Sequence, residues 1–289
     1  MAAQIIDGKL LSARVLDTLK ERTDKLIEAG VIPGLTVILV GDNPASQIYV
    51  ANKEKACAKI GVRSTVHRLP QTVTQSEVEA LIQRLNKDPA VHGILLQLPV
   101  PGHIDVSALL SLIDPRKDAD GFHYINTGKL FCGMPTVVAC TPKGAFQMIL
   151  STGIKVAGKN AVVVGRSNIV GKPMAMILMN ENATVSVCHS LTVSLKSYTV
   201  NADILVVAAG RPRLITADMV KPGAVVIDIG ITRENDKVVG DVDFEAVSEV
   251  AGFITPVPGG VGRMTVAMLL ENTVDAAELY GAQWNAGKQ

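Results

Sequence analysis

The chain has 289 residues, 48% of them hydrophobic, which is enough for one large or two medium globular domains with buried cores. Its 28 basic and 27 acidic residues leave a formal net charge of +1, which argues against the broad basic field of a nucleic-acid-binding or membrane-surface protein. Aromatic residues make up only 3% of the chain, too few for a platform on which bases stack. We therefore expect no nucleic-acid partner, and basic side chains that matter must act locally.

The cysteines and histidines indicate neither a disulfide framework nor a metal site. Cys57, Cys132, Cys140 and Cys188 are scattered without a Cys-x-x-Cys pair, and the five histidines are equally dispersed. The first residues lack a basic segment followed by an apolar core, and no apolar run reaches about 18 residues. These features predict a cytoplasmic protein with no metal ion and no membrane-spanning segment.

The first half of the chain alternates predicted helices and strands. Apolar residues at helical spacing predict a helix over residues 8–29, ended by Gly30. The apolar run 35–40 predicts a buried strand, and the helix after it is ended by Gly61. A strand at 64–69, a helix at 74–86 opened by a capping box, and a strand at 91–99 follow. This order predicts parallel strands joined by right-handed crossovers.

Tyr49 and Lys53 stand four residues apart in the helix that follows the first buried strand, so they share one helix face. Ser46, after the turn-forming pair Asn43-Pro44, is the expected N-cap. Because this helix starts at the carboxyl end of a strand, where open α/β sheets bind ligands, the phenol and the amine indicate reaction chemistry. The alternative is an ordinary surface helix with a solvated lysine and a half-buried tyrosine.

Two further polar residues belong to the same half. Gln97 lies in an apolar strand, and a buried amide without partners costs about 1 to 3 kcal/mol. It is expected either near Tyr49 and Lys53, at the same sheet edge, or hydrogen-bonded to loop backbone. Asp120, in the charged loop 114–123, is either a ligand-binding carboxylate or, with Gly121, part of a tight turn.

The second half has the pattern of a nucleotide-binding domain. Residues 161–173 predict a strand, a turn containing Gly165, Arg166 and Ser167, and a helix, as in the first crossing of a dinucleotide-binding fold. The glycine spacing is not Gly-x-Gly-x-x-Gly, so this segment alone is a weak signal. Strands predicted at 183–188, 203–209 and 224–229 complete a doubly wound parallel sheet.

The residues after the second of these strands favour NADP over NAD. An NAD site normally has a carboxylate there for the ribose hydroxyl, but this chain has Ser190. Arg166 and Ser190 offer a cation and a hydroxyl, which suit a 2′-phosphate. The alternative for Arg166 is an ion pair on the surface.

A loop dense in glycine and proline, residues 254–265, precedes a last helix predicted over residues 266–279. Its glycines allow the backbone to approach a ligand closely. The alternative is an interdomain hinge.

Taken together, these segments resemble the bifunctional methylenetetrahydrofolate dehydrogenase/cyclohydrolase family over nearly the whole chain. The resemblance rests on the segments 6–8, 44–53, 97–99, 117–122, 140–142, 165–171 and 256–262. It implies two α/β domains flanking a cleft, the second a Rossmann-like doubly wound parallel sheet. Residues 1–140 with 266–289 would form the folate-binding catalytic domain, and residues 141–265 the NADP-binding domain.

The family resemblance also implies two reactions on tetrahydrofolate one-carbon derivatives. 5,10-Methylenetetrahydrofolate is oxidised to the methenyl form with NADP, and that product is hydrolysed to 10-formyltetrahydrofolate. Lys53 is then the principal catalytic group, Gln97 holds it, Tyr49 positions the folate and Asp120 anchors the pterin. A lysine in a dry site near a cationic folate would have its ammonium form disfavoured, which frees the amine for proton transfer. A homodimer through the nucleotide domain is also implied.

The residues that the resemblance assigns to binding fall into two groups. The substrate-binding residues are Tyr49, Leu98, Pro99, Asp120, Pro258, Gly259 and Gly260. The cofactor-binding residues are Gly165, Arg166, Ser167, Ser190 and Ile231.

Three positions depart from the family pattern. Arg263 stands where the family has proline, Thr232 where it has asparagine, and Tyr124 where proline is common. Loss of proline at a helix start removes a pre-set φ, and a cation there opposes the helix dipole by about 0.3 to 1 kcal/mol. We expect Arg263 to alter folate affinity without loss of the chemistry.

Three other functions fit part of the pattern. Tyr49 and Lys53 also match the Tyr-x-x-x-Lys pair of short-chain dehydrogenases, but in that family the nucleotide turn precedes the pair, whereas here it follows. A dehydrogenase without cyclohydrolase activity is disfavoured because both Lys53 and Gln97 are present. A non-catalytic regulatory module that binds a dinucleotide is the third possibility.

Overall fold

The computed structural model describes residues 2–235 and 237–286, with side chains up to residue 281. The chain divides into two compact units. The six-strand unit comprises Met1–Ala13, Leu130–Met134 and Thr141–Thr265. The three-strand unit comprises Arg14–Lys129, Pro135–Cys140 and Val266–Gln289.

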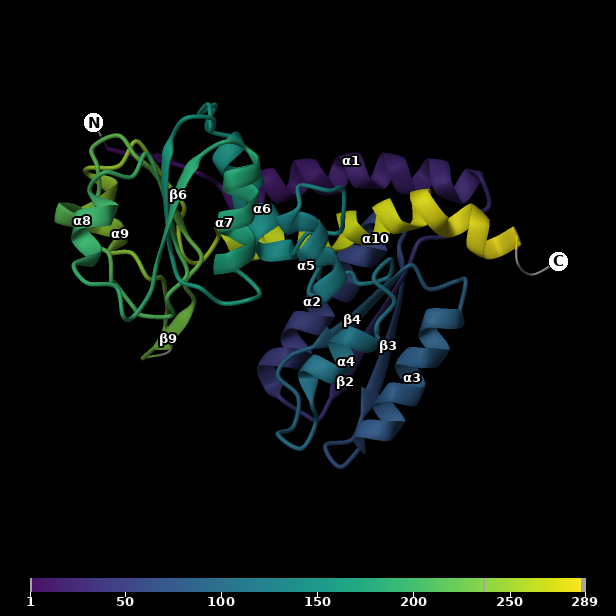
Figure 1. Ribbon diagram of the computed structural model, residues 1–289. Coiled ribbons are helices and arrows are strands. Elements are labelled where there is room, and N and C mark those ends of the chain that lie inside the picture. Colours follow the sequence, from purple (N-terminus) through teal and green to yellow (C-terminus); the bar gives the residue numbers. More distant parts are fainter. Residues whose placement is uncertain (1, 236, 287–289) are drawn as a thin grey trace. The chain divides into compact units, whose positions relative to one another are not determined.

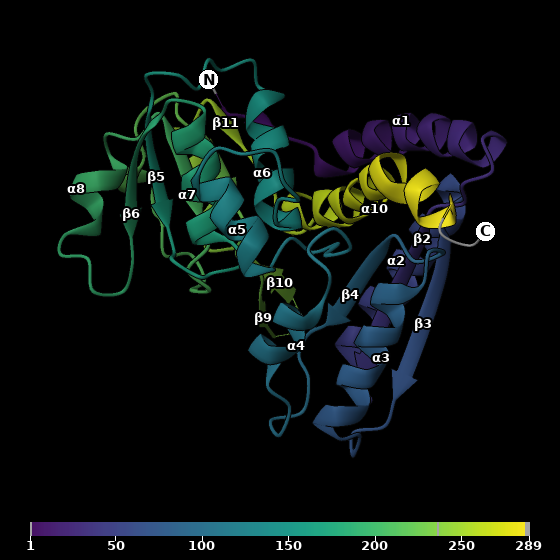
Figure 2. The same cartoon turned by 45° about the vertical axis from the view of Figure 1, so that its right-hand side comes forward.

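The three-strand unit is built on a parallel sheet in the order β3-β2-β4. Its strands are β2 (Gly34–Val40), β3 (Arg63–Leu69) and β4 (Gly93–Gln97). Helices α2 (Pro44–Ile60) and α3 (Gln75–Lys87) lie on opposite faces of this sheet, as Figure 2 shows. The central strand β2 is buried along its whole length, which explains its continuous apolar sequence. The predicted alternation of strands and helices is confirmed here.

Helix α2 begins earlier than expected. Its N-cap is Asn43, whose side chain accepts a hydrogen bond from the backbone N–H of Ser46, so the prediction of Ser46 as N-cap is wrong. Asn and Ser are comparable caps, and Pro44 at the first helical position favours the earlier start. Gly61 ends the helix with φ 81°, as predicted. The capping box of α3 is also confirmed, with Thr74 as N-cap.

The six-strand unit is the doubly wound parallel sheet, in the order β1-β11-β8-β7-β5-β6. Its edge strand β6 is labelled in Figure 1. Its strands are β1 (Gln4–Ile5), β5 (Asn160–Val164), β6 (Thr184–Cys188), β7 (Ile204–Val207), β8 (Val225–Asp228) and β11 (Phe253–Ile254). Helix α7 (Gly171–Asn180) joins β5 to β6 and packs against both. The chain runs from β5 to β6 on one side and then to β7 on the other, so the winding reverses beside β5. Ligands bind at such reversals in open α/β sheets.

The first strand, β1, belongs to this six-strand sheet. β1 pairs in parallel with β11, and the N–H of Ile6 donates to the carbonyl of Ile254 at 2.8 Å. Residues 1–13 therefore lie in the six-strand unit. A two-residue strand carries no periodicity, so its partner cannot be read from the sequence.

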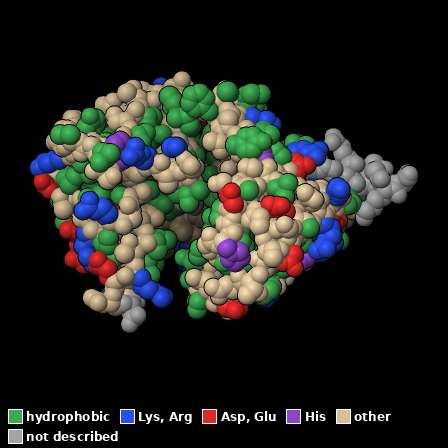
Figure 3. Space-filling view, turned by 60° about the horizontal axis from the view of Figure 1, so that its bottom comes forward, with side chains coloured by type: hydrophobic (Ala, Val, Ile, Leu, Met, Phe, Trp, Pro, Cys, Tyr) green, Lys and Arg blue, Asp and Glu red, His purple; other side chains and the backbone are tan. Residues whose placement is uncertain are grey.

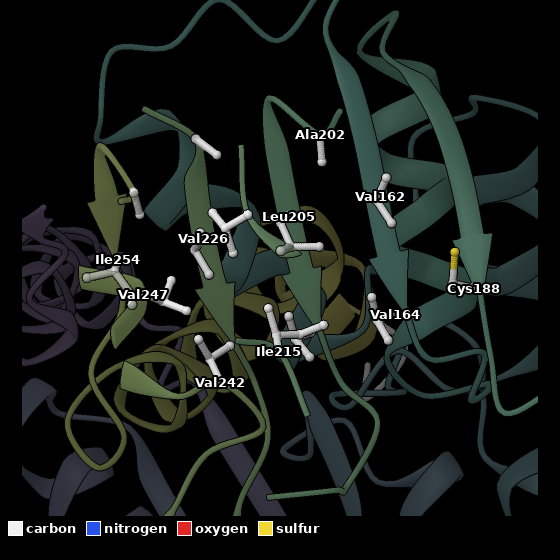
Figure 4. Close-up of a cluster of buried hydrophobic side chains, with 14 residues drawn as sticks. Val162, Val164, Cys188, Ala202, Leu205, Ile215, Val226, Val242, Val247 and Ile254 are labelled. Atoms are coloured by element: carbon white, nitrogen blue, oxygen red, sulfur yellow. The ribbon is translucent and has the colours of Figure 1, made fainter. Parts of the chain in front are cut away.

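A cluster of buried apolar side chains covers one face of this sheet, as Figure 4 shows. Val162, Leu205 and Val226 come from three neighbouring strands. Ile215 and Val242 join the cluster from segments outside the named strands, which meet in an isolated parallel bridge. The core thus fixes the loops at the carboxyl end of the sheet as well as the strands.

The remaining elements are short, apart from two long helices, α1 (Gly8–Glu28) and α10 (Val261–Ala286). The others are α4 (Val106–Leu112), α5 (Tyr124–Phe131), α6 (Cys140–Leu150), α8 (Leu195–Thr199), η1 (Ala217–Met219), α9 (Phe244–Ser248), and the antiparallel pair β9 (Thr232–Glu234) and β10 (Lys237–Val239). Helix α10 starts at Val261, five residues before the predicted start at 266. No helix in the described part of the chain combines the length and apolar character needed to span a bilayer.

Candidate functional site

Lys53 and Gln97 are in direct contact in the three-strand unit. The Lys53 Nζ donates a hydrogen bond to Gln97 Oε1 at 2.9 Å. Gln97 is the last residue of β4, and its Nε2 donates to the carbonyl of Leu98 at 2.7 Å. Both expectations for Gln97 are therefore confirmed, since it contacts Lys53 and also bonds to loop backbone.

Burial lowers the pKa of Lys53. Desolvation is the largest cause, and the negative charge of Asp120 opposes it. Gln97 accepts the lysine hydrogen bond without adding a charge, so it holds the amine while stabilising the ammonium form less than a carboxylate would. The predicted effect of a dry site on Lys53 is confirmed in direction.

Asp120 is half-buried and lies close enough to Lys53 for their charges to interact. Desolvation raises the pKa of Asp120 to about 7; the charge of Lys53 lowers it and that of Asp118 raises it. Asp120 also belongs to a tight turn, because the N–H of Gly121, at φ 76°, donates to the carbonyl of Asp118 at 3.2 Å. The turn and the titratable carboxylate therefore coexist.

Two residues that sequence reasoning missed hold the Asp120 loop. The carboxylate of Asp118 accepts from the N–H groups of Gly121, Phe122 and His123. Asn272, only 3% exposed on α10, donates to the carbonyl oxygens of Ala119 and Val138, both at 3.0 Å. A buried amide in an apolar helix was the signal for Asn272, by the same argument that singled out Gln97.

Tyr49, Leu98 and Pro99 flank this group. Tyr49 lies one turn before Lys53 on α2, with half of its surface exposed. Leu98 is half-buried and Pro99 exposed, directly after β4. Lys53, Gln97 and Asp120 thus form a partly enclosed polar centre, and Tyr49 adds an accessible aromatic surface.

The six-strand unit carries a cavity of about 430 Å³ at the carboxyl ends of β5, β6 and β7. It is lined by the predicted cofactor residues Gly165, Arg166, Ser167 and Ser190, and also by Val164, His189, Thr192, Leu195, Ala208, Ala209, Arg211 and Leu214. Sequence reasoning missed His189, Thr192 and Arg211. Arg211 adds a second guanidinium to the lining. Its place in the loop after β7, at the carboxyl end of the sheet, could have identified it from the sequence.

Two glycines allow the turn after β5 to pack closely against the neighbouring backbone. Gly165 has φ 129°, and a β carbon there would collide with the carbonyl oxygen of Ala208. A β carbon on Gly171 would collide with the carbonyl of Gly165. Gly165 and Gly171 therefore replace the usual glycine spacing and bring the turn against the start of α7.

The Ser167 side chain is hydrogen-bonded to the start of α7. Its hydroxyl oxygen accepts hydrogen bonds from the backbone N–H groups of Val170 and Gly171, at 3.2 and 3.4 Å. Arg166 takes part in none of the ion pairs between described residues, so the surface ion pair proposed as its alternative is not observed. The glycine turn and the guanidinium groups of Arg166 and Arg211 in the cavity lining fit a phosphorylated dinucleotide. Ile231 follows β8 with an exposed side chain.

Pro258, Gly259 and Gly260 lie before α10 in the six-strand unit. A β carbon on Gly8 would collide with the carbonyl oxygen of Gly260, so Gly8 permits close packing of this loop. The hydroxyl oxygens of Thr141 and Thr265 are hydrogen-bonded to each other at 3.1 Å.

Each departure from the family pattern has a definite place. Arg263 lies in the first turn of α10, and its N–H donates to the carbonyl of Gly260 at 3.2 Å. Thr232 begins β9 and pairs with Val239. Tyr124 begins α5 with an exposed ring against His123. The effect of Arg263 on folate affinity stays a prediction.

Among the described residues, no group of three or more His, Cys, Asp or Glu side chains could hold a metal ion.

A Rossmann-like sheet with a cavity at the point where its winding reverses, and a separate lysine-amide-carboxylate centre, define a nucleotide-dependent enzyme of two α/β units. The family models for tetrahydrofolate dehydrogenase/cyclohydrolase match residues 6–120, as the catalytic domain, and residues 139–280, as the NAD(P)-binding domain. The chain belongs to the tetrahydrofolate dehydrogenase/cyclohydrolase family.

Individual relatives agree with this membership. A bifunctional protein FolD from Streptococcus pneumoniae is 58% identical over 276 residues, which cover 95% of this chain and 97% of the relative. The crystal structure of FolD from Campylobacter jejuni has a TM-score of 0.95 at 52% identity, covering 96% of this chain and 99% of that one. FolD from Trypanosoma brucei, solved with NADP and an inhibitor, has a TM-score of 0.92 at 40% identity, covering 96% and 98%.

Both family domains are present, so the chain is a bifunctional enzyme with dehydrogenase and cyclohydrolase activities and an NAD(P)-binding domain. The short-chain dehydrogenase, the monofunctional dehydrogenase and the non-catalytic module are set aside.

Proposed function

We propose that the chain oxidises 5,10-methylenetetrahydrofolate to the methenyl form with NADP and hydrolyses that product to 10-formyltetrahydrofolate. The hydrogen bond from Lys53 to Gln97, in a site that lowers the lysine pKa, is the observation that carries the hydrolytic half. In this reaction water adds to the methenyl carbon and loses a proton, which Lys53 takes as the neutral amine. Lys53 returns that proton to the ring nitrogen as the ring C–N bond breaks, and the hydroxyl group on the carbon loses its own proton to solvent as the formyl C=O forms.

The neighbouring residues hold the folate and the lysine. Asp120 accepts hydrogen bonds from the amino and ring N–H groups of the pterin. Tyr49 offers its exposed ring as a surface that positions the folate. Leu98, whose carbonyl accepts a hydrogen bond from Gln97, and Pro99 are assigned to the folate beside it. Gln97 fixes the direction of the lysine amine. Pro258, Gly259 and Gly260 are assigned to the folate as well.

NADP, when bound, accepts a hydride from the one-carbon bridge. Arg166 and Ser190 would hold its 2′-phosphate, and the absence of a carboxylate after β6 disfavours NAD. The Gly165 turn and Ser167, before α7, would hold the pyrophosphate. Ile231, which has an exposed side chain after β8, is assigned to the cofactor as well. We assign folate binding and catalysis to residues 1–140 with 266–289, and NADP binding to residues 141–265. Within the first range, residues 1–13 pack in the six-strand unit.

The wider setting belongs to the same proposal. We assign the chain to the cytoplasm, as a homodimer through the nucleotide domain that binds neither nucleic acid nor membrane. The net charge of +1 supports the absence of nucleic-acid binding, and on the face shown in Figure 3 lysine and arginine are interspersed with acidic residues. Sedimentation of the purified protein tests the dimer.

A coupled absorbance assay tests the two reactions. Addition of 5,10-methylenetetrahydrofolate and NADP should yield NADPH, with a methenyl absorbance that rises and then decays. NAD should support a much lower rate. Failure to form NADPH would contradict the dehydrogenase, and a methenyl signal that persists at its uncatalysed rate would contradict the cyclohydrolase.

A further inference from the structure

Two buried carboxylates in the six-strand unit have no role in the reactions described above. Asp228 ends β8 and is 3% exposed, while Asp241 follows β10 and is 0% exposed. Neither takes part in an ion pair among the described residues. A buried charge without a cation is costly, so the groups that compensate it are informative.

Backbone N–H groups take the place of a cation. The Asp241 Oδ2 accepts from the N–H of Ala209 at 2.6 Å and from that of Gly210 at 2.7 Å. The Asp228 carboxylate accepts from Gly230, Asp241 and Val242, at 2.9, 3.0 and 2.9 Å. The two carboxylates are thus linked through the backbone of Asp241 itself.

Each carboxylate also packs against a glycine beside the other one. A β carbon on Gly230, two residues after Asp228, would collide with the carboxyl group of Asp241. A β carbon on Gly240, just before Asp241, would collide with the carboxylate of Asp228. We call Asp228, Gly230, Gly240 and Asp241 the carboxylate clasp.

The clasp reaches the wall of the nucleotide cavity. Ala208, Ala209 and Arg211 line that cavity, and the two N–H groups held by Asp241 belong to the same turn after β7. Gly230, held by Asp228, directly precedes Ile231. Because Val207 and Asp228 are paired neighbours in the sheet, the clasp joins the turns that follow β7 and β8.

Burying these two carboxylates without a cation reduces the stability of the folded state. The pKa of Asp228 is raised to about 6: desolvation is the largest cause, the charge of Asp241 also raises it, and the hydrogen bonds from the three N–H groups lower it. The Asp241 Oδ1 has no hydrogen-bond partner among the described residues and lies against Gly230. A cost of this kind at a ligand cavity points to a function in shaping it.

We propose that Asp241 is a positioning residue of the dehydrogenase reaction, whose carboxylate holds the turn 208–211 in the shape that receives the nucleotide. This inference rests on the proposed function, because it takes NADP as the ligand of the cavity. Asp241 acts through the backbone and does not contact the cofactor in this account.

Asp241→Asn tests the proposal, because it keeps the shape and removes the charge. We expect calorimetric titration to show NADP affinity reduced about tenfold, since two charge-assisted hydrogen bonds are weakened. Hydrolysis of methenyltetrahydrofolate needs no nucleotide and should stay within about twofold of the parent rate, which reports an intact fold. Asp243→Asn is the matched control: Asp243 caps α9 through the N–H of Ala246, and both readouts should be unchanged.

Equal NADP affinity in Asp241→Asn and the parent would overturn the proposal. So would a parallel loss of NADP binding and hydrolysis, which marks a merely structural role. If Asp241→Asn does not fold, Gly230→Ala carries the test, because its β carbon displaces the same carboxylate and should weaken NADP selectively. Titration of the parent separates the two claims, since absence of NADP binding there would contradict the proposed cofactor itself.

Discussion

The chemistry at Lys53 depends on which neighbours carry charge. Its pKa is lowered by burial and raised by Asp120, while Gln97 supplies a hydrogen bond without a charge. The Tyr-x-x-x-Lys spacing therefore presents a lysine for proton transfer, with the tyrosine as a surface beside it. The pH dependence of methenyl hydrolysis should report the balance between these neighbours.

Asp120→Asn should shift the ascending limb of the pH profile of hydrolysis to lower pH. Asp120 raises the lysine pKa, so its removal lowers that pKa and the neutral amine persists into more acidic solution. The measurement is kcat against pH at saturating methenyl-folate, because weaker pterin binding would otherwise enter. A limb that stays in place or moves to higher pH would show that Asp120 does not act on Lys53.

Gln97→Glu should shift the same limb the opposite way. A carboxylate in place of Oε1, 2.9 Å from the lysine Nζ, stabilises the ammonium form and raises its pKa. Hydrolysis at neutral pH should fall about tenfold and recover in alkaline solution, because the amine is the working form. An acid shift, or a loss that no pH restores, would count against this role for Gln97.

Among the elements, the crossing from β5 to α7 is the one that sets the nucleotide site. Gly165 combines a φ of 129° with contact against the carbonyl of Ala208, so two independent constraints demand glycine. Gly165 and Gly171 thus form the tight turn before α7 without the Gly-x-Gly-x-x-Gly spacing that is usual in dinucleotide-binding folds.

Gly165→Ala should weaken NADP binding by about tenfold or more, because the turn must move away from Ala208. Methenyl hydrolysis, which uses no nucleotide, should remain within about twofold. Gly158→Ala is the control for backbone strain alone, since Gly158 has φ 78° with no atom within 4 Å of the added carbon. Similar NADP affinities in the two variants would show that the contact with Ala208 is unimportant.

At the scale of the whole molecule, local patterns predicted most of the architecture. The apolar run that became β2, the capping box at Thr74 and the parallel alternation follow from propensity and periodicity, which act over a few residues. The N-cap of α2 was misplaced because Asn43 and Ser46 are equally good caps three residues apart.

What the sequence did not reveal depends on long-range contacts. Asn272 and Val138, whose carbonyl accepts its hydrogen bond, lie 134 residues apart in the chain. Strand β1, near the start of the chain, pairs with β11, near its end. The carboxylate clasp likewise joins residues from separate segments. Such pairs leave no periodic pattern in the sequence. A polar residue in an apolar segment does indicate that its side chain has a hydrogen-bond partner, but not which one.

The central claim is that one chain carries two chemistries that can be separated, with Lys53 responsible for hydrolysis and the six-strand unit for NADP. Lys53→Met tests it most directly, because it removes the amine and keeps an unbranched apolar stem. Methenyl hydrolysis should fall to the uncatalysed rate, while calorimetric NADP affinity stays within about twofold of the parent. Hydrolysis at the parent rate would contradict the account and remove Lys53 from the mechanism.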